Sequence, residues 1–308
     1  MAKDNNRYTL TRWQRCCVAM LYALCRFIAI MPRWVRYYIF EEIIYVLLCY
    51  VLRYRYKVIF NNLRNSFPAK SEAELKGIVK RFYRYLAEQM INTISVAGAG
   101  PERMRKCLTF PDSEAYKHAV AGNDVILMGG HYGCWEYFSA IATYDPDHLT
   151  MSIYHPLSNS VLDELFKRMR RLENTVLVPR DESLRFFIKH RSGDKYLAMG
   201  LIADQNPFFR KDAHWFKFLN QDTIFADGGE LLARRFSLPV WFAGMRRRRR
   251  GEYEMYVEQI YDGKESVAEH EITERYVRRL EKAIEECPEL WLWSHRRWKY
   301  KPEDQALL

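Results

Sequence analysis

The sequence lacks the short motifs that identify several common kinds of site. It has no GxSxG elbow, so we expect no serine nucleophile of the hydrolase kind. The GxGxxG fingerprint of dinucleotide-binding folds and the P-loop are also absent. HExxH is missing and no other cluster of ligands stands out, which argues against zinc. The 7 cysteines are odd in number and form no CxxC pair, which favours reduced thiols in a cytosol-facing protein over a disulfide framework.

The composition excludes disorder and directs attention to phosphate-bearing partners. Hydrophobic residues make up 49% of the 308 residues and charged residues 28%, so the chain can bury a full core in one large or two smaller domains. The net charge is +10, and residues 1–60 contain ten cationic and three anionic side chains. Such a balance suits nucleic acid or an anionic membrane. No nucleic-acid-binding motif is recognisable, and the 15% of aromatic residues suits a membrane interface, so we expect a membrane and no nucleic acid.

No uninterrupted apolar run reaches the roughly 20 residues that a confident membrane span needs. Residues 18–31 are apolar except for Arg26, and residues 37–52 are interrupted by Glu41 and Glu42. No small-residue cleavage site follows the first run, so it is no ordinary signal peptide. The two runs predict one marginal anchor plus an interfacial helix, with two buried core helices as the alternative. We therefore expect a membrane-anchoring helical segment at 1–60, with its N-terminus in the cytosol, and an α/β domain at 61–308.

The body of the chain has the pattern of an α/β fold. Helical spacing over residues 71–97 follows a capping box at Ser71 and Glu74. Short apolar runs then alternate with helical stretches, which predicts a central, largely parallel sheet flanked by helices. Arg246–Arg250, followed by Gly251, is interpreted as a hairpin turn. The expected strands are 125–128, 150–154, 175–179, 197–202, 239–245 and 253–259, and the expected helices are 135–143, 158–171, 182–191, 229–236 and 271–286.

The stretch VILMGGHYGCWE at residues 125–136 carries the candidate chemistry. A buried strand runs into Gly129 and Gly130, which permit a sharp turn, and then into His131. The carboxyl end of a strand is where ligands bind in open α/β sheets. If His131 lies in the turn and Glu136 in the first turns of the next helix, the carboxylate can hold one imidazole nitrogen and leave the other as a general base. An unrelated surface histidine and glutamate is the alternative.

The GGHYGCWE stretch resembles the His-x4-Asp/Glu motif of glycerolipid acyltransferases. The chain as a whole resembles the bacterial lipid A biosynthesis acyltransferases, which add secondary acyl chains to lipid A precursors. The motif is shared by a wide superfamily, whereas the C-terminal block is far more specific. The blocks that carry the resemblance are NNLRNSFP (61–68), YHPLSN (154–159), ADQNP (203–207), FADGGELLA (225–233) and LWLWSHRRW (290–298).

Two positions depart from the family's pattern. Asn174 stands where a glycine is usual after a helix end, and it is compatible with a left-handed cap. His155 stands where an arginine is usual, which leaves open which residue meets an acceptor's phosphate. Arg170 best fits the family's helix-end arginine, with Arg171 as the shifted alternative.

The resemblance implies direct acyl transfer at the cytoplasmic face of the bacterial inner membrane, without cofactor or metal. His131 would deprotonate an acceptor hydroxyl, which attacks the thioester of acyl carrier protein or of acyl-CoA, while Glu136 orients the imidazole. Backbone amides near Gly129–Gly133 or Arg170 would stabilise the oxyanion, and Gly130, Arg170 and Asp204 are candidate substrate-binding residues. Asp204 could equally cap a helix and shape a loop.

Several alternatives remain open at this point. The acceptor could be another amphiphile, such as an aminolipid, a glycolipid or a lysophospholipid. A nonenzymatic basic membrane-binding protein is a further possibility. His295, Arg296 and Arg297 could meet acidic head groups, or play a structural role by pairing with glutamates. An aromatic cluster after Asp204 could form an apolar lid or belong to the core: it comprises Trp215, Phe216, Phe218 and Phe225.

Overall fold

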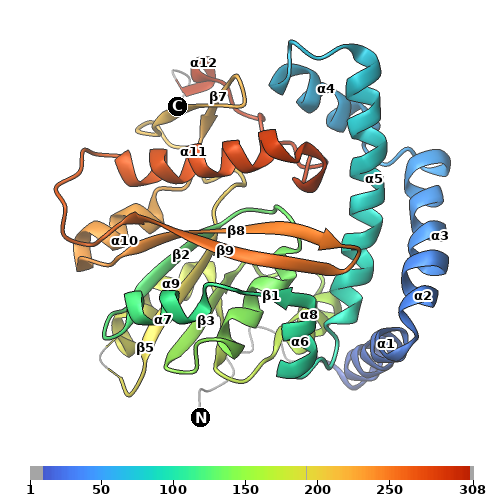
Figure 1. Cartoon of the computed structure of the whole chain (residues 1–308), viewed down its shortest axis with the longest axis horizontal. Coiled ribbons are helices and arrows are strands. Elements are labelled where there is room, and N and C mark those ends of the chain that lie inside the picture. The colour runs from blue at the N-terminus through green and yellow to red at the C-terminus, as the bar shows by residue number, and fades with distance from the viewer. Residues whose placement is uncertain (1–9, 192, 306–308) are drawn as a thin grey trace.

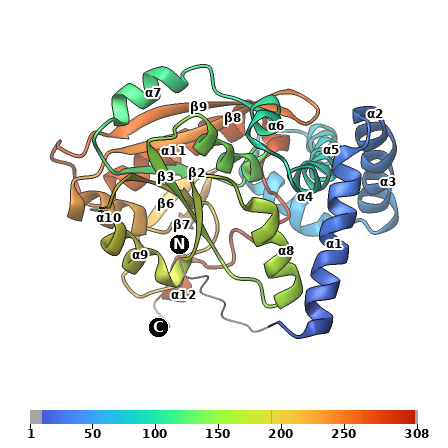
Figure 2. The ribbon, with the colours of Figure 1, turned by 90° about the horizontal axis from the view of Figure 1, so that it is seen from below.

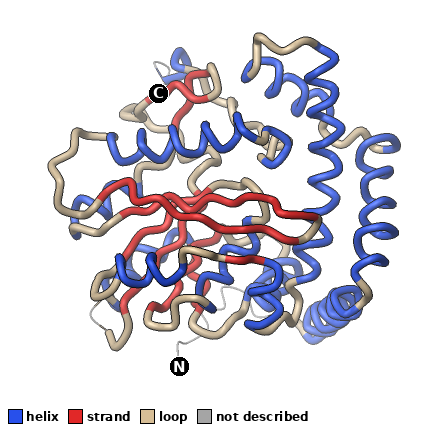
Figure 3. The backbone as a smooth tube through the Cα atoms, viewed as in Figure 1, coloured by secondary structure: helices blue, strands red, loops and turns tan. Residues whose placement is uncertain are grey.

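A seven-stranded sheet forms the centre of the protein. The computed structural model describes residues 10–191 and 193–305. Neighbouring strands pair in parallel except β8 and β9, which form an antiparallel hairpin. Figure 3 shows the strands in red at the centre, with helices around them. The expected α/β class and largely parallel sheet are therefore confirmed. The strand order is β1 (Leu108–Thr109), β9 (Glu252–Tyr261), β8 (Val240–Arg249), β2 (Val125–Gly129), β5 (Tyr196–Ile202), β3 (His148–Tyr154) and β4 (Thr175–Pro179).

Helices cover both faces of this sheet. One apolar core joins it to α11, α10, α9 and α5, and a second joins it to α6, α7, α8 and η3. In Figure 1, α11 and α7 lie on opposite sides of the β8–β9 hairpin. The α-helices after residue 55 are α4 (Tyr56–Ser66), α5 (Glu72–Ser95), α6 (Pro101–Cys107), α7 (Ser113–Val120), α8 (Ser160–Arg170), α9 (Ser183–His190), α10 (Gly228–Phe236), α11 (Glu271–Glu286) and α12 (Pro302–Gln305), and the 3-10 helices are η3 (Trp135–Thr143), η4 (Arg180–Glu182) and η5 (Pro288–Leu290).

The sequence patterns located the strands and helices that they predicted to within a few residues, whereas α4, α6, α7, α12 and η5 were not predicted. The capping box at Ser71 begins α5 as expected, and Asn174 has the left-handed φ of 56° that its position suggested. The arginine run differs from the prediction, because residues 246–249 extend β8 and the chain reverses only at Arg250 and Gly251. Pairing with β9 explains this, since the strand continues as long as its partner does. Three short strands were not expected: β1, β6 (Trp215–Phe218) and β7 (Gln221–Ile224).

The N-terminal helices lie along the outside of α5 (Figure 1). The first apolar run belongs to α1 (Arg12–Ile30), which packs beside α8 (Figure 2) and is long and apolar enough to cross a membrane. A core helix or a signal sequence can pass the same test, but α1 is mostly exposed. After the short α2 (Arg33–Val35), the second run lies in η1 (Arg36–Phe40), α3 (Glu41–Val46) and η2 (Leu47–Val51).

This second run is tied to the body of the protein. Tyr37 is buried and donates a hydrogen bond to Asn92 Oδ1 on α5 over 2.9 Å. Arg36, which directly precedes the run, donates from Nη1 to Ser95 Oγ over 2.6 Å. The boundary expected after residue 60 falls inside α4, and the division into two domains stays a prediction.

The strands that carry the candidate site end level with one another. Gly129 of β2 pairs with Ile202 of β5, and Tyr154 of β3 pairs with Pro179 of β4. Because parallel strands bring their carboxyl ends to one edge, the loops that follow them meet there. His131 and Asp204 lie on two of these loops.

Candidate active site

The two glycines before His131 allow the loop to pack against the β5 loop. The Gly129 carbonyl accepts hydrogen bonds from Tyr276 Oη at 2.8 Å and from the Ala203 amide at 3.1 Å. At Gly130, a β-carbon would lie 2.9 Å from Leu280 Cδ1 and 3.4 Å from Asp204 Cγ. Gly130 therefore lets the Asp204 carboxylate approach the histidine loop.

Asp204 is the partner of the His131 imidazole. Its carboxylate is buried, and its Oδ1 lies 2.7 Å from His131 Nδ1. Oδ2 accepts from the His131 amide at 2.9 Å and from Trp291 Nε1 at 2.8 Å. Burial raises the pKa of Asp204, but the charge of His131 and these hydrogen bonds outweigh it and leave the pKa below its ordinary value. An ionised Asp204 accepts from Nδ1–H and thereby places the free lone pair of the imidazole on Nε2.

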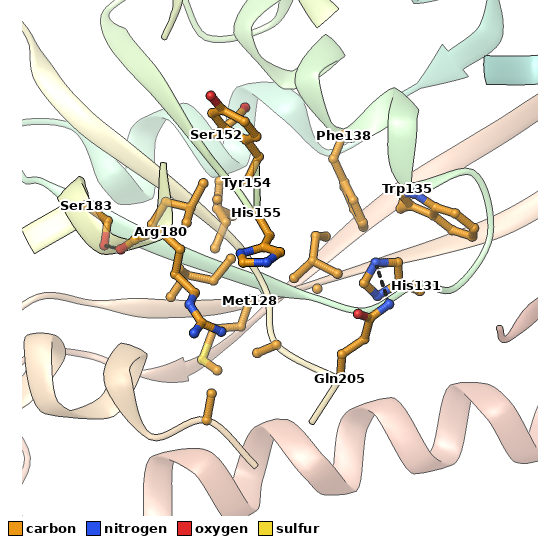
Figure 4. Close-up of a pocket in the computed structure, with 18 of the residues that line it drawn as sticks. Met128, His131, Trp135, Phe138, Ser152, Tyr154, His155, Arg180, Ser183 and Gln205 are labelled. Atoms are coloured by element: carbon orange, nitrogen blue, oxygen red, sulfur yellow. Dashed lines mark hydrogen bonds between the residues drawn. The ribbon is translucent and has the colours of Figure 1, made fainter. Parts of the chain in front are cut away.

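The other imidazole nitrogen faces the cavity. His131 Nε2 lies 3.2 Å from Gln205 Nε2, the contact drawn as a dashed line in Figure 4. The ring edge of Trp135 packs against the imidazole with centroids 5.2 Å apart. The His131 side chain is 20% exposed, so a substrate can reach Nε2 while Asp204 stays out of solvent. This arrangement has the geometry of a general base.

Glu136 differs from the expectation in its partner. It lies in the first turn of η3, as anticipated, and is buried, but its carboxylate forms a bidentate pair with Arg170. The distances are 2.8 Å from Arg170 Nε and 2.7 Å from Nη2. Within the described residues no hydrogen bond joins Glu136 to His131. The reason is that Asp204 already occupies Nδ1, while the guanidinium fork matches a carboxylate better than an imidazole does.

The expected oxyanion donors are partly committed elsewhere. The His131 amide donates to Asp204, and the Gly133 amide donates to the Leu290 carbonyl over 2.9 Å. Neither amide is free to stabilise a substrate. Arg170 uses Nε and Nη2 for Glu136 and still lines the cavity that contains His131. Its guanidinium therefore remains a candidate donor.

The C-terminal block packs against the loop that carries His131. Trp291 pairs with Tyr132 in an isolated bridge, and the Leu292 amide donates to the His131 carbonyl over 3.2 Å. Buried Arg297 donates from Nη1 to Asn206 Oδ1 and from Nη2 to the Ile224 carbonyl. These contacts favour the structural interpretation of Arg297, although its partners are amide and carbonyl oxygens rather than glutamates.

Several functional contacts were not anticipated from the sequence. Gln205 beside Nε2 and Trp291 on Asp204 both belong to blocks that the resemblance had marked, but no periodicity showed that these blocks meet. Tyr85 and Gln89 of α5 both donate to the Gly133 carbonyl, over 2.8 and 2.9 Å, and no sequence signal pointed to them. These two hydrogen bonds hold the loop after His131 against α5, although the donors lie 48 and 44 residues earlier in the sequence.

A large cavity of about 1930 Å³ opens at His131 and is lined by Glu136, Arg170 and Gln205 as well. The aromatic lid predicted after Asp204 does not border it. Phe216, Phe218 and Phe225 are buried in the core against α11 and the C-terminal block, so the core interpretation is correct for these three, whereas Trp215 is half-buried and donates a hydrogen bond to Gln305. In the described part of the chain, no group of three or more His, Cys, Asp or Glu residues is arranged to hold a metal ion.

Comparisons with known proteins identify the family of the chain. The bacterial lipid A biosynthesis acyltransferase family matches residues 4–300. The lipid A biosynthesis palmitoleoyltransferase of Escherichia coli (strain K12) is 22% identical over 261 residues, which cover 83% of each chain. A lipid A biosynthesis acyltransferase of Shigella flexneri is similar to the same extent. The chain therefore belongs to the bacterial lipid A biosynthesis acyltransferase family and is an acyltransferase.

Proposed function

We propose that this protein moves a fatty acyl chain from the thioester of an acyl carrier to a hydroxyl of a lipid A precursor. The observation that carries the proposal is the His131 imidazole, held at Nδ1 by buried Asp204 and open to a large cavity at Nε2. A cavity of this size accommodates the chains of both amphiphiles. Family membership supports lipid A as the acceptor class.

His131 acts as general base in the proposed reaction. Nε2 takes the proton of the acceptor hydroxyl as its oxygen attacks the thioester carbonyl. The tetrahedral intermediate then collapses, the C–S bond breaks, and the imidazolium returns the proton to the departing thiolate. Asp204 stabilises the imidazolium throughout, and no acyl-enzyme forms.

Glu136 acts through Arg170 in this proposal. The bidentate pair holds the guanidinium at the cavity wall, where it can face the developing oxyanion or a phosphate of the acceptor. The His-Glu arrangement expected from the motif thus becomes two neighbouring pairs, His131 with Asp204 and Glu136 with Arg170. Each has its own task, proton transfer for the first and charge stabilisation for the second.

We propose acyl carrier protein as the donor's carrier, with acyl-CoA as the second candidate. Acyl carrier protein is acidic, and a basic enzyme surface would steer it to the site. The net charge of +10 supports this pairing. The name of the Escherichia coli relative, a palmitoleoyltransferase, supports a long fatty acyl chain as the transferred group.

We further propose that the protein works on the cytoplasmic face of the inner membrane, held there by its N-terminal helices. α1 presents large apolar side chains to solvent along its length, including Met20, Leu24 and Phe27, each more than half exposed. In water such a surface is costly, whereas a bilayer covers it. Substitution of Leu24 and Phe27 by serine should release protein from membrane pellets without unfolding it.

A reconstituted transfer assay tests the function. Purified protein in mixed micelles receives labelled acyl carrier protein or acyl-CoA, with a lipid A precursor in phosphorylated or dephosphorylated form, and His131→Ala is the inactive control. We expect transfer only with active enzyme, and an Arg170→Ala penalty that is larger for the phosphorylated acceptor. An equal penalty on both acceptors would show that Arg170 does not read the phosphate.

An acyltransferase for another amphiphile is the alternative, because the same site serves any acceptor hydroxyl. Mass spectrometry of total lipids from cells with and without the protein distinguishes the two. A change confined to an aminolipid, glycolipid or lysophospholipid would refute lipid A as the acceptor.

A further inference from the structure

One arm of the cavity follows a single face of the sheet. Leu127 of β2, Gly200 of β5 and Ser152 of β3 are register partners in parallel pairs and therefore point to the same side. All three line the cavity. The core on this side contains Leu127, Leu165 and Met169, so the arm runs between the sheet and α8. We call it the α8-side groove.

The floor of the α8-side groove carries small side chains at its centre, at Gly200 and Ser152. Along β3 it is lined in turn by Tyr154, Ser152 and Thr150, which alternate with residues that face the other core. Thr150 lies four residues before Tyr154, which corresponds to about 13 Å along the strand, so the groove extends about 13 Å from the ends of the strands. Its walls are largely apolar and come from η3 and α8: Phe138, Ile141, Leu165, Phe166 and Met169. Figure 4 shows Phe138, Ser152 and Tyr154 together on one side of the cavity.

Gly200 lies in the middle of this floor, and its backbone does not require glycine. A β-carbon there would meet only the Met151 carbonyl oxygen, at an ordinary 3.8 Å, and its φ is not in the left-handed region. At Gly130, in contrast, a β-carbon would collide with Leu280. Glycine inside a strand weakens it and often marks a place where a ligand approaches closely. The missing side chain at Gly200 therefore creates room in the groove.

The groove suits a fatty acyl chain better than a phosphorylated head group. Its two cations, Lys167 and Arg170, lie in the last turn of α8 and are paired with Asp163 and Glu136. The cations of the opposite arm come from η4, α10 and the C-terminal segment: Arg180, Arg234, Arg235 and Lys299. α10 and the residues around it belong to the core on the other face of the sheet. Both arms meet at His131, where the thioester and the hydroxyl must meet.

We propose that the α8-side groove holds the acyl chain of the donor and that Gly200 sets the length of chain that the enzyme transfers. This inference rests on the proposed function. A larger side chain at Gly200 would project into the groove and shorten it, so long chains would lose contacts or fail to enter. Chains that end above Gly200 would be unaffected.

The test is a series of Gly200→Ala, Gly200→Val and Gly200→Leu assayed with octanoyl, lauroyl, myristoyl and palmitoyl donors. Each methylene excluded from an apolar site lowers kcat/KM by about tenfold or more. We expect the preferred chain to shorten stepwise along the series, with Gly200→Leu at least about tenfold slower on palmitoyl and nearly unchanged on octanoyl donors. Gly77→Leu on α5 is the matched control, because position 77 is outside the cavity and its β-carbon would lie 3.6 Å from flexible Arg81.

Two outcomes would overturn the inference: an unchanged chain-length profile in folded Gly200→Leu, or an equal loss on every donor. If Gly200→Leu does not fold, Gly200→Ala and Ser152→Val, on the neighbouring strand, give the same comparison with a smaller intrusion. Binding of the same donors by calorimetry is measured in parallel. If the wild type transfers nothing but binds long chains that Gly200→Leu rejects, the proposed function fails and the groove assignment stands.

Discussion

Replacement of Asp204 by asparagine tests the central feature of the site. Asparagine has nearly the shape of aspartate, so it can still accept hydrogen bonds from Trp291 and from the His131 amide. It cannot supply the negative charge that faces His131 Nδ1 at 2.7 Å. If its amide group turns toward the ring, it donates to Nδ1 and places the imidazole proton on Nε2, the wrong tautomer for a base.

The expected loss in kcat follows from the contact. A hydrogen bond between charged groups contributes about 1.5–3 kcal/mol, and the full bond exists only once His131 is protonated in the transition state. At 1.36 kcal/mol for each tenfold change, this gives a loss of roughly ten- to 150-fold, and the wrong tautomer adds to it. The KM values should change little, because Asp204 is buried behind His131.

The assay is the reconstituted transfer reaction, with circular dichroism and thermal unfolding as folding controls and Trp291→Phe as the matched variant. Trp291→Phe removes one hydrogen bond to Asp204 Oδ2 but keeps the charge, so we expect a smaller loss than for Asp204→Asn. A well-folded Asp204→Asn enzyme with kcat within about threefold of the wild type would refute the role of Asp204. The free energy that corresponds to a threefold loss is well below that of one charged hydrogen bond.

The remaining predictions concern the base, the ion pair, acid stability and the membrane. His131→Ala should lower the transfer rate by about 10²- to 10⁴-fold with unchanged thermal unfolding, and retention of a tenth of the activity would contradict general-base catalysis. Arg170→Lys keeps the charge but loses the bidentate geometry with Glu136, so transfer should fall while far-ultraviolet dichroism stays native. Burial foremost, with the charge of Arg297, lowers the pKa of His295 to about 4, whereas in the unfolded chain it is about 6.5. The unfolded state therefore binds the extra proton between these values, stability falls as the pH drops through this window, and His295→Gln should flatten the dependence of melting temperature on pH there. Phe27→Asp on the exposed face of α1 should reduce sedimentation with anionic vesicles, and unchanged sedimentation would argue against that face as the membrane contact.

The same sign argument applies to Asp204 at lower pH. Its folded pKa is depressed, so its contribution to stability is complete above the unfolded pKa of about 3.9 and is lost as the pH falls through the folded value. Thermal unfolding of Asp204→Asn should lack this acid-sensitive component. The comparison with His295→Gln separates the two groups, because their windows lie on opposite sides of pH 4.

The sequence predicted the individual strands, helices and caps because these depend on residues that are neighbours along the chain. The apolar runs of β2, β3 and β5, the capping box at Ser71 and the heptad-like spacing of α5 each act within a few residues. The strand followed by Gly129, Gly130 and His131 also predicted that His131 would lie at the carboxyl edge of the sheet, where parallel strands end together. What only a resemblance added was the acyltransferase family, which the comparisons confirmed.

Tertiary structure alone decided which carboxylate meets His131. Glu136 is five residues away and Asp204 is 73, yet the imidazole pairs with the distant one. Spacing can show that Glu136 could reach His131, but it cannot show that the loop after β5 brings a second carboxylate closer, or that the end of α8 brings Arg170 to Glu136. Those outcomes depend on the order of strands in the sheet, which is set by packing among segments far apart in sequence. For the same reason the open floor at Gly200 had no signal in the sequence, because a glycine in an apolar strand acquires its meaning only when β3 and α8 enclose the space beside it.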